Sequence, residues 1–173
     1  MRTIEGCIIR PMRPDDLDQV LSWRNHADIR RFMLTSHEIT ADEHRNWFKL
    51  ASSNPLKHLL IVEERDCPLG YVQFTCAASG AASDWGFYVV PGSPKGSGKK
   101  LGTTALDYAF NDLALHKVCG QALDFNEASI CFHEALGFLK EGVLREQHLI
   151  GGRFHDLYCF GLLKNEWLYK KST

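Results

Sequence analysis

Short apolar runs and segments of helical periodicity alternate along the chain. Runs rich in apolar and β-branched residues predict strands at residues 4–12, 58–64, 71–76, 85–90, 118–125, 138–149 and 153–163. Helices are predicted to begin near Pro14, after Thr40, near Leu101 and at Glu127. The central elements alternate and the flanking strands follow one another directly, which predicts a mixed α/β fold.

Local signals fix several of these boundaries. Thr40 and Glu43 have the spacing of a capping box at a helix start. Gly137 has the place of a helix C-cap, and the glycines at 151–152 divide the last two strands into a hairpin. We therefore expect a single domain over residues 1–173, with a mixed, mostly antiparallel sheet of about seven strands and helices on both faces.

Composition excludes some classes of function. The chain has 173 residues and a net charge of −1, so neither a nucleic acid nor an anionic membrane is an expected partner. No apolar stretch is long enough to span a membrane, and the first residues lack the apolar core of a signal peptide, so we expect a cytoplasmic protein. The six cysteines form no C-x-x-C pair and are interpreted as reduced core thiols; no metal site is expected.

A glycine-rich loop lies between the strand at 85–90 and the helix predicted to follow it. Successive backbone N–H groups in such a loop, together with the start of a helix, suit a pyrophosphate. Gly98 and Gly102 let the backbone approach such a ligand closely. A flexible surface loop is the competing interpretation.

Two other nucleotide sites are excluded by the spacing in this loop. A Walker A loop needs glycine at 93 and serine or threonine at 100, where the chain has Ser93 and Lys100. A Rossmann fingerprint beginning at Gly96 needs glycine at 101, where the chain has Leu101.

A second polar pattern follows the strand at 118–125. Asn126 is positioned to cap the next helix, and Asn126, Ser129 and His133 are spaced i, i+3 and i+7. These three side chains therefore share one helix face, where they can line a cleft. Taken alone, His133 is more simply interpreted as a solvated surface histidine.

Together the two segments resemble the GCN5-related N-acetyltransferases. Residues 96–110 are similar to the pyrophosphate motif of that superfamily, and residues 126–138 to the segment after its fifth strand. The branch with ribosomal-protein and spermidine acetyltransferases shares further matches, at residues 137–142, Arg145, residues 152–156 and residues 166–167.

This resemblance implies acetyl-CoA as cosubstrate and no metal. It implies that cofactor-binding residues are Val89, Val90, Gly98, Lys99, Lys100, Leu101, Gly102, Thr103, Asn126 and Ser129. The chain departs from the family at Ser97, where arginine or glutamine is usual, and at Lys100, where glycine or alanine is usual. Whether Lys100 contacts phosphate is left open by the sequence.

Within the superfamily the chain is more similar to the nucleotide-sugar N-acetyltransferases of pseudaminic acid biosynthesis, a pathway of flagellin glycosylation. The similarity is carried by residues 23–26, 43–48, 85–88 and 132–134. It implies acetylation of the 4-amino group of UDP-4-amino-4,6-dideoxy-N-acetyl-β-L-altrosamine. It also implies substrate-binding roles for Arg24, His44, Thr75 and Tyr88.

Two of these residues also stand out physically. Arg24 continues the apolar stripe of Leu17, Val20 and Leu21, so its guanidinium must find anions or carbonyls or else extend to solvent at the helix end. His44 shares a face with apolar residues, where a histidine is more often part of the core; the resemblance favours the substrate pocket instead.

The resemblance also suggests a mechanism. The backbone N–H near Val89 is expected to donate to the thioester oxygen. His133 stands where the superfamily commonly has tyrosine, and is predicted to be the general acid for the leaving thiolate. The base is open between His44 and a water held by Tyr88.

Several alternatives remain at this level. A ribosomal-protein N-terminal or polyamine acetyltransferase is the nearest enzyme alternative, although a polyamine site should be rich in carboxylates. A non-catalytic acetyl-CoA-binding protein is the alternative of another class. A homodimer is possible.

Overall fold

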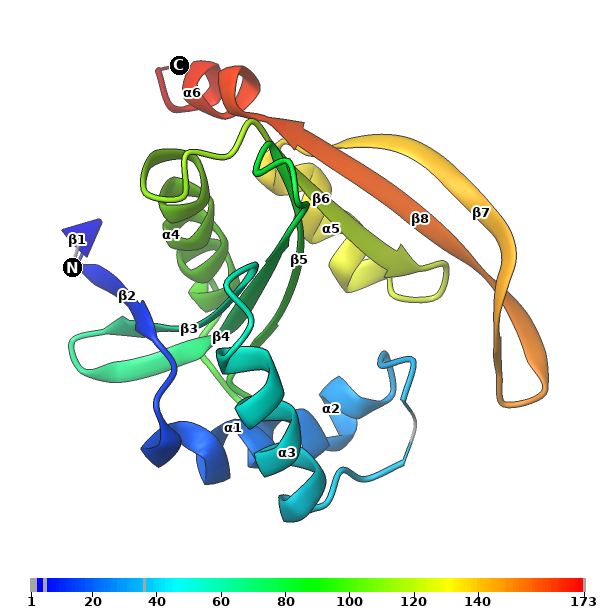
Figure 1. Ribbon diagram of the computed structural model, residues 1–173. Coiled ribbons are helices and arrows are strands. Elements are labelled where there is room, and N and C mark those ends of the chain that lie inside the picture. The colour runs from blue at the N-terminus through cyan, green and yellow to red at the C-terminus, as the bar shows by residue number, and fades with distance from the viewer. Residues whose placement is uncertain (1–2, 5, 36, 173) are drawn as a thin grey trace.

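Eight strands form one sheet in the computed structural model, which describes residues 3–4, 6–35 and 37–172 (Figure 1). The strands lie in the order β1-β2-β3-β4-β5-β6-β8-β7. Their bounds are β1 Thr3–Ile4, β2 Cys7–Pro11, β3 Lys57–Glu64, β4 Cys67–Cys76, β5 Ala82–Val89, β6 Lys117–Leu123, β7 Leu139–Ile150 and β8 Arg153–Leu163. Neighbouring strands are antiparallel except β5 and β6, which are parallel. The mixed, mostly antiparallel sheet predicted from the sequence is thereby confirmed.

Helices cover both faces of this sheet. They are η1 Pro14–Asp16, α1 Leu17–Asn25, α2 Ala27–Arg30, α3 Ala41–Ser52, α4 Ser97–Asn111, α5 Glu127–Leu136 and α6 Lys164–Ser172. One core cluster joins α4 and α5 to the sheet through residues such as Val72, Leu106 and Phe110. A second core cluster, which includes Val20 and Ile61, lies under α1 and α3 on the other face.

The parallel pair β5 and β6 is the feature that positions the site. The two strands pair only over Ala82–Asp84 and Lys117–Cys119, and then diverge (Figure 1). Beyond Asp84 the side of β5 that faces β6 therefore has no strand partner. Polar groups at the end of β5 are left available to a ligand.

Two boundaries and two helices differ from the sequence-based prediction. The first predicted strand is two strands, because Gly6 adopts a left-handed φ of 81° between them. Helix α4 begins at Ser97 rather than near Leu101, since Gly96 with a φ of 97° ends the loop earlier. Helices α2 and α6 were not predicted.

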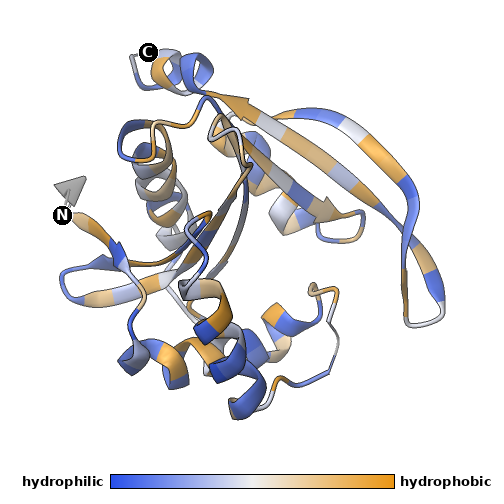
Figure 2. Ribbon diagram, in the orientation of Figure 1, coloured by the Kyte–Doolittle hydropathy of each residue, from blue (hydrophilic) through white to orange (hydrophobic). Residues whose placement is uncertain are grey.

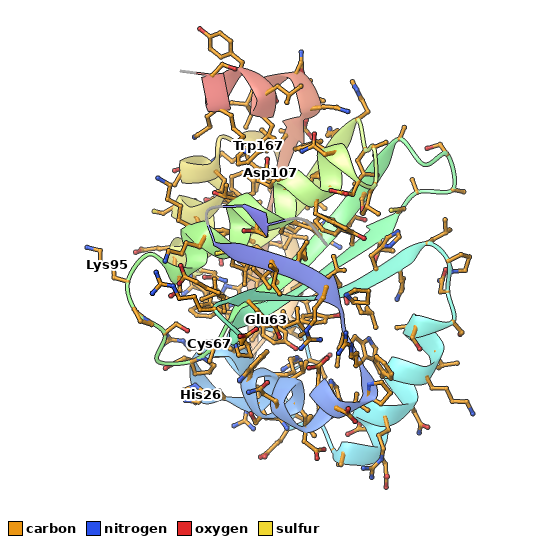
Figure 3. All side chains as sticks on the ribbon, turned by 90° about the vertical axis from the view of Figure 1, so that its left-hand side faces the viewer. His26, Glu63, Cys67, Lys95, Asp107 and Trp167 are labelled. Atoms are coloured by element: carbon orange, nitrogen blue, oxygen red, sulfur yellow. The ribbon has the colours of Figure 1, made fainter. Side chains whose placement is uncertain are left out.

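Helix α6 is held by a buried polar contact. The indole N–H of Trp167 donates to Asp107 of α4 at 2.9 Å, and Lys171 Nζ lies 2.6 Å from the other carboxylate oxygen (Figure 3). Asp107 is 2% exposed, so these two partners satisfy the buried carboxylate of this α4 residue. The match at residues 166–167 thus has a structural role.

The prediction of core thiols is confirmed for Cys7, which is buried, and wrong for Cys67 and Cys131, which are exposed. The other three cysteines are half-buried, and Cys76 packs against the core. Cys67 follows the tight β3–β4 turn, where Arg65 and Asp66 have positive φ, and it lies at the surface.

None of the helices within the described ranges is long and apolar enough to cross a bilayer. No cluster of three metal-ligating side chains occurs among those residues either.

The β7–β8 hairpin extends away from the body of the molecule. Hydrophobic residues continue along its length (Figure 2), and the side chains of Leu149 and Phe154 are largely exposed. Strand β7 forms an edge of the sheet.

Candidate active site

A cavity of about 840 Å³ lies between the diverging strands and the helices around them. Its wall is built from β4 and β5, from α5, and from α1–α3 with the loop between them. Seven of the residues predicted for the site line it: Arg24, His44, Tyr88, Val89, Asn126, Ser129 and His133. The structure therefore brings together residues separated by more than 100 positions in the sequence.

The backbone N–H of Val89 faces the gap between β5 and β6. In an antiparallel pair, alternate residues direct their polar groups toward or away from the partner strand. The N–H of Ala77 donates to Ala82 O at 2.8 Å and that of Val90 to Leu69 O at 2.9 Å, so even-numbered residues of β5 bond to β4. Val89 therefore directs its N–H away from β4, as a donor to a thioester oxygen requires.

Val90 does not fit its predicted role. Its N–H is bonded to Leu69 O, and its own carbonyl accepts from Ser93 N at 3.1 Å. Both main-chain groups are used by the fold, and the side chain packs in the core under α1 and α3. Val90 anchors the end of β5 and has no free polar group for a cofactor.

The start of α4 offers fewer free amides than the sequence suggested. Because the helix begins at Ser97, the N–H groups of Leu101, Gly102 and Thr103 belong to its internal hydrogen bonds. Lys100 N–H donates to Gly96 O at 3.1 Å. The first-turn amides of Gly98 and Lys99 remain, without a side-chain cap, as donors for an anion.

Two more residues of this segment have structural partners. Lys100 forms an ion pair with Glu64 at the end of β3, so its ammonium already has a carboxylate partner. A Cβ on Gly102 would lie 2.6 Å from Leu136 and 2.7 Å from Phe132, so glycine is needed there for α5 to approach α4. At Gly98 a Cβ would make only ordinary contacts, at 3.6 Å from Phe132 and Val89. Leu101 is fully buried in the core.

Helix α5 presents its polar stripe to the cavity as predicted. Asn126 caps the helix, its Oδ1 accepting from Ser129 N at 3.1 Å. Gly137 ends it with a φ of 98°. Asn126, Ser129 and His133 all line the cavity, which confirms that they share one face.

The hydrogen bonds of His133 argue against its predicted role as proton donor. Its Nδ1 lies 2.7 Å from the carbonyl oxygen of Ser129, which only accepts, so Nδ1 carries the proton. Its Nε2 accepts from the indole N–H of Trp85 at 3.1 Å. A second proton on Nε2 would face that N–H donor, and burial lowers the pKa of His133 further. The imidazole is therefore neutral and fully partnered.

His133 is also enclosed by the core. It is 1% exposed and stacks on Phe160 with ring centroids 4.9 Å apart and an interplanar angle of 8°. A Cβ on Gly120 would lie 2.3 Å from His133 Nε2 and 2.9 Å from Trp85 Nε1. Glycine in β6 thus leaves room for a hydrogen bond that ties α5 to β5 across the gap.

Arg24 enters the cavity without a counter-ion. Its Nη2 donates to Thr35 O at 3.2 Å, whereas Nη1 is buried and has no hydrogen-bond partner. Within the described ranges it forms no salt bridge. Burial lowers the pKa of Arg24 from its ordinary value, with Tyr88 opposing and Arg30 adding to the effect.

His44 and the aromatic residues form the wall next to Arg24. The His44 ring stacks on Trp47 at 5.0 Å and 17°, and no hydrogen bond is formed by its ring nitrogens with the described residues. Burial, and then the charge of Arg24, lower the pKa of His44, while Asp18 raises it. Tyr71 meets Trp47 edge-on at 6.1 Å and stacks on Tyr88 at 5.1 Å, which extends the aromatic wall.

Thr75 does not reach the cavity. It pairs with Asp84 at the closed end of the gap, one position beyond Trp85, which does line the cavity. Its place is taken by Gln73, two residues earlier on the same face of β4. Gln73 and Gln121 were not identified as site residues from the sequence. Side chains two positions apart on a strand lie on the same face, and this alternation indicates both positions.

An aromatic contact lies beside the cavity. Phe32 follows α2 and stacks on Phe125 of the β6–α5 loop, with centroids 6.0 Å apart. Phe125 in turn meets the ring of His155 edge-on at 4.6 Å, and His155 Nδ1 pairs with Asp124 at 2.9 Å. This chain of contacts joins the α2 segment to the opposite wall.

Comparison with known proteins gives this site a family. The acetyltransferase (GNAT) domain matches residues 7–139. The chain is 29% identical over 170 residues to the SPbeta prophage-derived uncharacterized N-acetyltransferase YokL of Bacillus subtilis (strain 168), covering 95% of this chain and 94% of that protein. It is 24% identical over 123 residues to Acetyltransferase PseH of Campylobacter jejuni subsp. jejuni serotype O:23/36 (strain 81-176), covering 71% and 76%.

The fold is also that of a solved acetyltransferase. Spermidine N-acetyltransferase from Vibrio cholerae, in complex with CoA and spermine, superimposes with a TM-score of 0.87 at 23% identity, covering 95% of this chain and 99% of that one. The family match spans most of the chain and includes both β5 and α5. The chain therefore belongs to the GNAT acetyltransferases and is an acetyl-CoA-dependent N-acetyltransferase.

Proposed function

We propose that the enzyme acetylates a primary amine on a nucleotide-linked amino-deoxy sugar of the pseudaminic acid type, the 4-amino group of UDP-4-amino-4,6-dideoxy-N-acetyl-β-L-altrosamine. One observation carries this proposal: Arg24 presents a buried guanidinium nitrogen without a partner in the cavity. A buried cation with no counter-ion favours a ligand that supplies an anion. A nucleoside diphosphate does so.

The aromatic wall supports the same class of acceptor. Trp47 meets the ring of Tyr71 edge-on with centroids 6.1 Å apart, and Tyr71 stacks on Tyr88 with centroids 5.1 Å apart. Aromatic surfaces of this kind suit a pyrimidine base or the methyl group of a deoxysugar. The similarity to Acetyltransferase PseH is in keeping with this acceptor.

A polyamine is the second candidate acceptor. The fold matches a spermidine N-acetyltransferase, and two acidic residues, Asp28 and Glu43, line the cavity. Both already have partners: Glu43 accepts from Thr40 N at 2.7 Å and lies 3.1 Å from His37 Nε2, and Asp28 pairs with Arg31 at 3.9 Å. A polyamine would also have to lie beside the unpaired charge of Arg24, which favours the anionic acceptor.

In this proposal the acetyl donor lies between α4 and the end of β5. The free amides of Gly98 and Lys99 at the start of α4 are donors that fit its diphosphate. Val89 N–H donates to the thioester oxygen and stabilises the negative charge that develops on it. Asn126 and Ser129 line the same space from α5. Holding the two reactants in this gap supplies much of the rate.

A screen of acceptors tests the proposal. The enzyme is incubated with acetyl-CoA and, in turn, the UDP-linked 4-amino sugar, spermidine and N-terminal peptides, and release of CoA thiol is measured. We expect turnover with the UDP-linked sugar and a kcat/KM at least tenfold lower with the other two. Preferred acetylation of spermidine would establish the polyamine function instead.

Substitution of Arg24 separates its role from that of the donor site. Arg24→Gln removes the charge, and Arg24→Lys keeps it but loses the forked donor. We expect Arg24→Gln to raise the KM for the nucleotide sugar about tenfold or more, with Arg24→Lys intermediate, because a charge-assisted hydrogen bond contributes about 1.5–3 kcal/mol. The KM for acetyl-CoA should stay within about twofold, and a change there of equal size would place Arg24 outside the acceptor site.

The proposed setting is the cytoplasm, where exposed thiols such as those of Cys67 and Cys131 stay reduced. The homodimer expected from the sequence stays a prediction.

A further inference from the structure

We propose that His44 is the general base that takes the proton from the acceptor ammonium. The inference rests on the acetyl transfer proposed above, but only on the amine and not on the sugar attached to it. It follows from comparing the titratable side chains of the cavity wall, most of which are already committed to partners within the protein.

The two acidic residues of the wall are not available as bases. Glu43 accepts hydrogen bonds from Thr40 N and His37, and these hold its pKa at about 2, so it accepts a proton poorly at neutral pH. Asp28 is 71% exposed and lies near both His26 and Arg31, at 3.7 and 3.9 Å. Its carboxylate is at the solvent side of the cavity and pairs there with the guanidinium of Arg31.

The two tyrosines keep their protons. Burial raises the pKa of Tyr71 well above its ordinary value, and its hydroxyl donates to Gln73 at 3.0 Å. Burial likewise raises the pKa of Tyr88, with Arg24 opposing. Either hydroxyl can orient a water, but a phenol that retains its proton accepts none.

His133 is excluded by its hydrogen bonds. Its Nε2 lone pair already accepts from Trp85, and its Nδ1 proton is donated to Ser129 O. A proton taken from an ammonium would break the contact with Trp85 in a closed core.

His44 differs from all of these groups. It is 5% exposed, it lines the cavity, and its ring nitrogens form no hydrogen bond with the described residues. The little surface it retains therefore opens on the cavity. Its face is held parallel to Trp47, which fixes the ring plane without using either nitrogen. A free lone pair is thus presented to an acceptor, directly or through one water.

The surroundings of His44 keep it unprotonated. Burial is the main cause of its lowered pKa, the charge of Arg24 adds to that effect, and Asp18 opposes it. From its own helix Glu43 is tied to Thr40 and His37, and from β5 Tyr88 is neutral. The pKa of His44 therefore lies below 6.5, and the imidazole is ready to accept a proton at neutral pH.

The protons of the step balance as follows. An imidazole nitrogen of His44 takes one proton from R–NH₃⁺, and the nitrogen lone pair then attacks the thioester carbonyl carbon. The C–N bond forms and the C–S bond breaks, with the electron pair leaving on sulfur. The second proton of the attacking nitrogen neutralises the thiolate, whose ordinary pKa is about 8.5, so no separate acid is needed. His44 returns its proton to solvent before the next turnover.

The test is the pH dependence of kcat/KM in the wild type and in His44→Gln, which keeps a polar side chain without a titrating nitrogen. For the wild type we expect activity to fall only below about pH 6.5, with the titration of His44. For His44→Gln we expect a loss of about 100-fold at pH 7. The acid limb should also move up toward the pKa of the acceptor amine, about 8–10, because only free amine then reacts.

The matched control is His58→Gln. His58 lies on β3, outside the cavity, and burial lowers its pKa as well. His58→Gln should keep the acid limb of the wild-type pH profile of kcat/KM. If His44→Gln folds poorly, His44→Ala with added imidazole replaces it, and recovery of rate with imidazole concentration is expected.

Two results would overturn the inference. One is a His44→Gln enzyme whose KM is raised but whose pH profile of kcat/KM keeps its acid limb in place. That result would show that His44 binds the acceptor and is not the base. The other is His44→Ala that imidazole fails to rescue. If the sugar is inactive and spermidine is acetylated, the same profiles are measured with spermidine, so failure of the acceptor proposal is distinguished from failure of the base. A wild type inactive with all acceptors would overturn both.

Discussion

At the scale of single residues, His133 shows how far hydrogen-bond geometry constrains chemistry. A histidine seven residues after Asn126 resembles a proton donor in sequence. In the fold its two nitrogens bond to Trp85 and to Ser129 O, and its ring stacks on Phe160. Its contribution is to hold α5 at a fixed position against β5.

Replacement of His133 should therefore affect stability more than proton transfer. His133→Phe keeps an aromatic ring but leaves Trp85 N–H and Ser129 O without partners. We expect the free energy of unfolding to fall by about 1–3 kcal/mol, measured by urea denaturation. The pH limbs of kcat should stay in place. His116→Phe, at an exposed position, is the control. If His133→Phe lost one limb of the pH profile of kcat while its stability stayed intact, the proton-donor role of His133 would be restored.

Single positions also show what sequence patterns reveal. The cap at Asn126 and the stop at Gly137 were predictable because both signals are local. For Arg24 only part of the outcome was predictable. The apolar stripe that it continues indicates that the side chain is buried, but not that its Nη1 has no hydrogen-bond partner. The Trp85–His133 hydrogen bond was not predictable from the sequence. It joins residues 48 positions apart, one on β5 and one on α5, and it needs a glycine in a third element, β6.

At the scale of elements, the start of α4 decides which amides meet a phosphate. Gly96 begins the helix through its backbone conformation, without a capping side chain. The Gly/Ser/Lys-rich composition of this segment indicated a loop, so the predicted start lay four residues late. The same shift moves Leu101–Thr103 from the ligand surface into the helix interior, and leaves Gly98 and Lys99 as donors.

A pair of variants at Lys99 tests this assignment. Lys99→Pro removes the amide N–H in the first turn, where proline is compatible with a helix, and Lys99→Ala removes only the charge. We expect Lys99→Pro to weaken CoA binding at least tenfold in calorimetry, and Lys99→Ala to weaken it by less than threefold. Circular dichroism should show equal helix content. Equal affinities for the two variants would remove this amide from the site.

At the scale of the whole molecule, several buried histidines link stability to pH. Burial lowers the pKa of His44, His58 and His133 in the folded state. The unfolded chain, with ordinary values near 6.5, then binds more protons as the pH falls. Folding is therefore most favoured above pH 6.5 and loses stability below it.

Urea denaturation at pH 7.5, 6.5 and 5.5 measures this dependence. We expect the free energy of unfolding to decrease below pH 6.5, by at most about 1.4 kcal/mol per pH unit for each histidine that stays neutral. Asp16 and Glu43, whose pKa values are lowered by hydrogen bonds, act only at more acidic pH. A flat profile between pH 7.5 and 5.5 would show that the three rings are protonated freely in the folded protein.

The ring contact between Phe32 and Phe125 has a consequence for what enters and leaves. Phe32 lines the cavity, and Phe125 packs against Phe32 from the β6–α5 loop. A ligand that reached the cavity between these two segments would therefore have to separate the two rings.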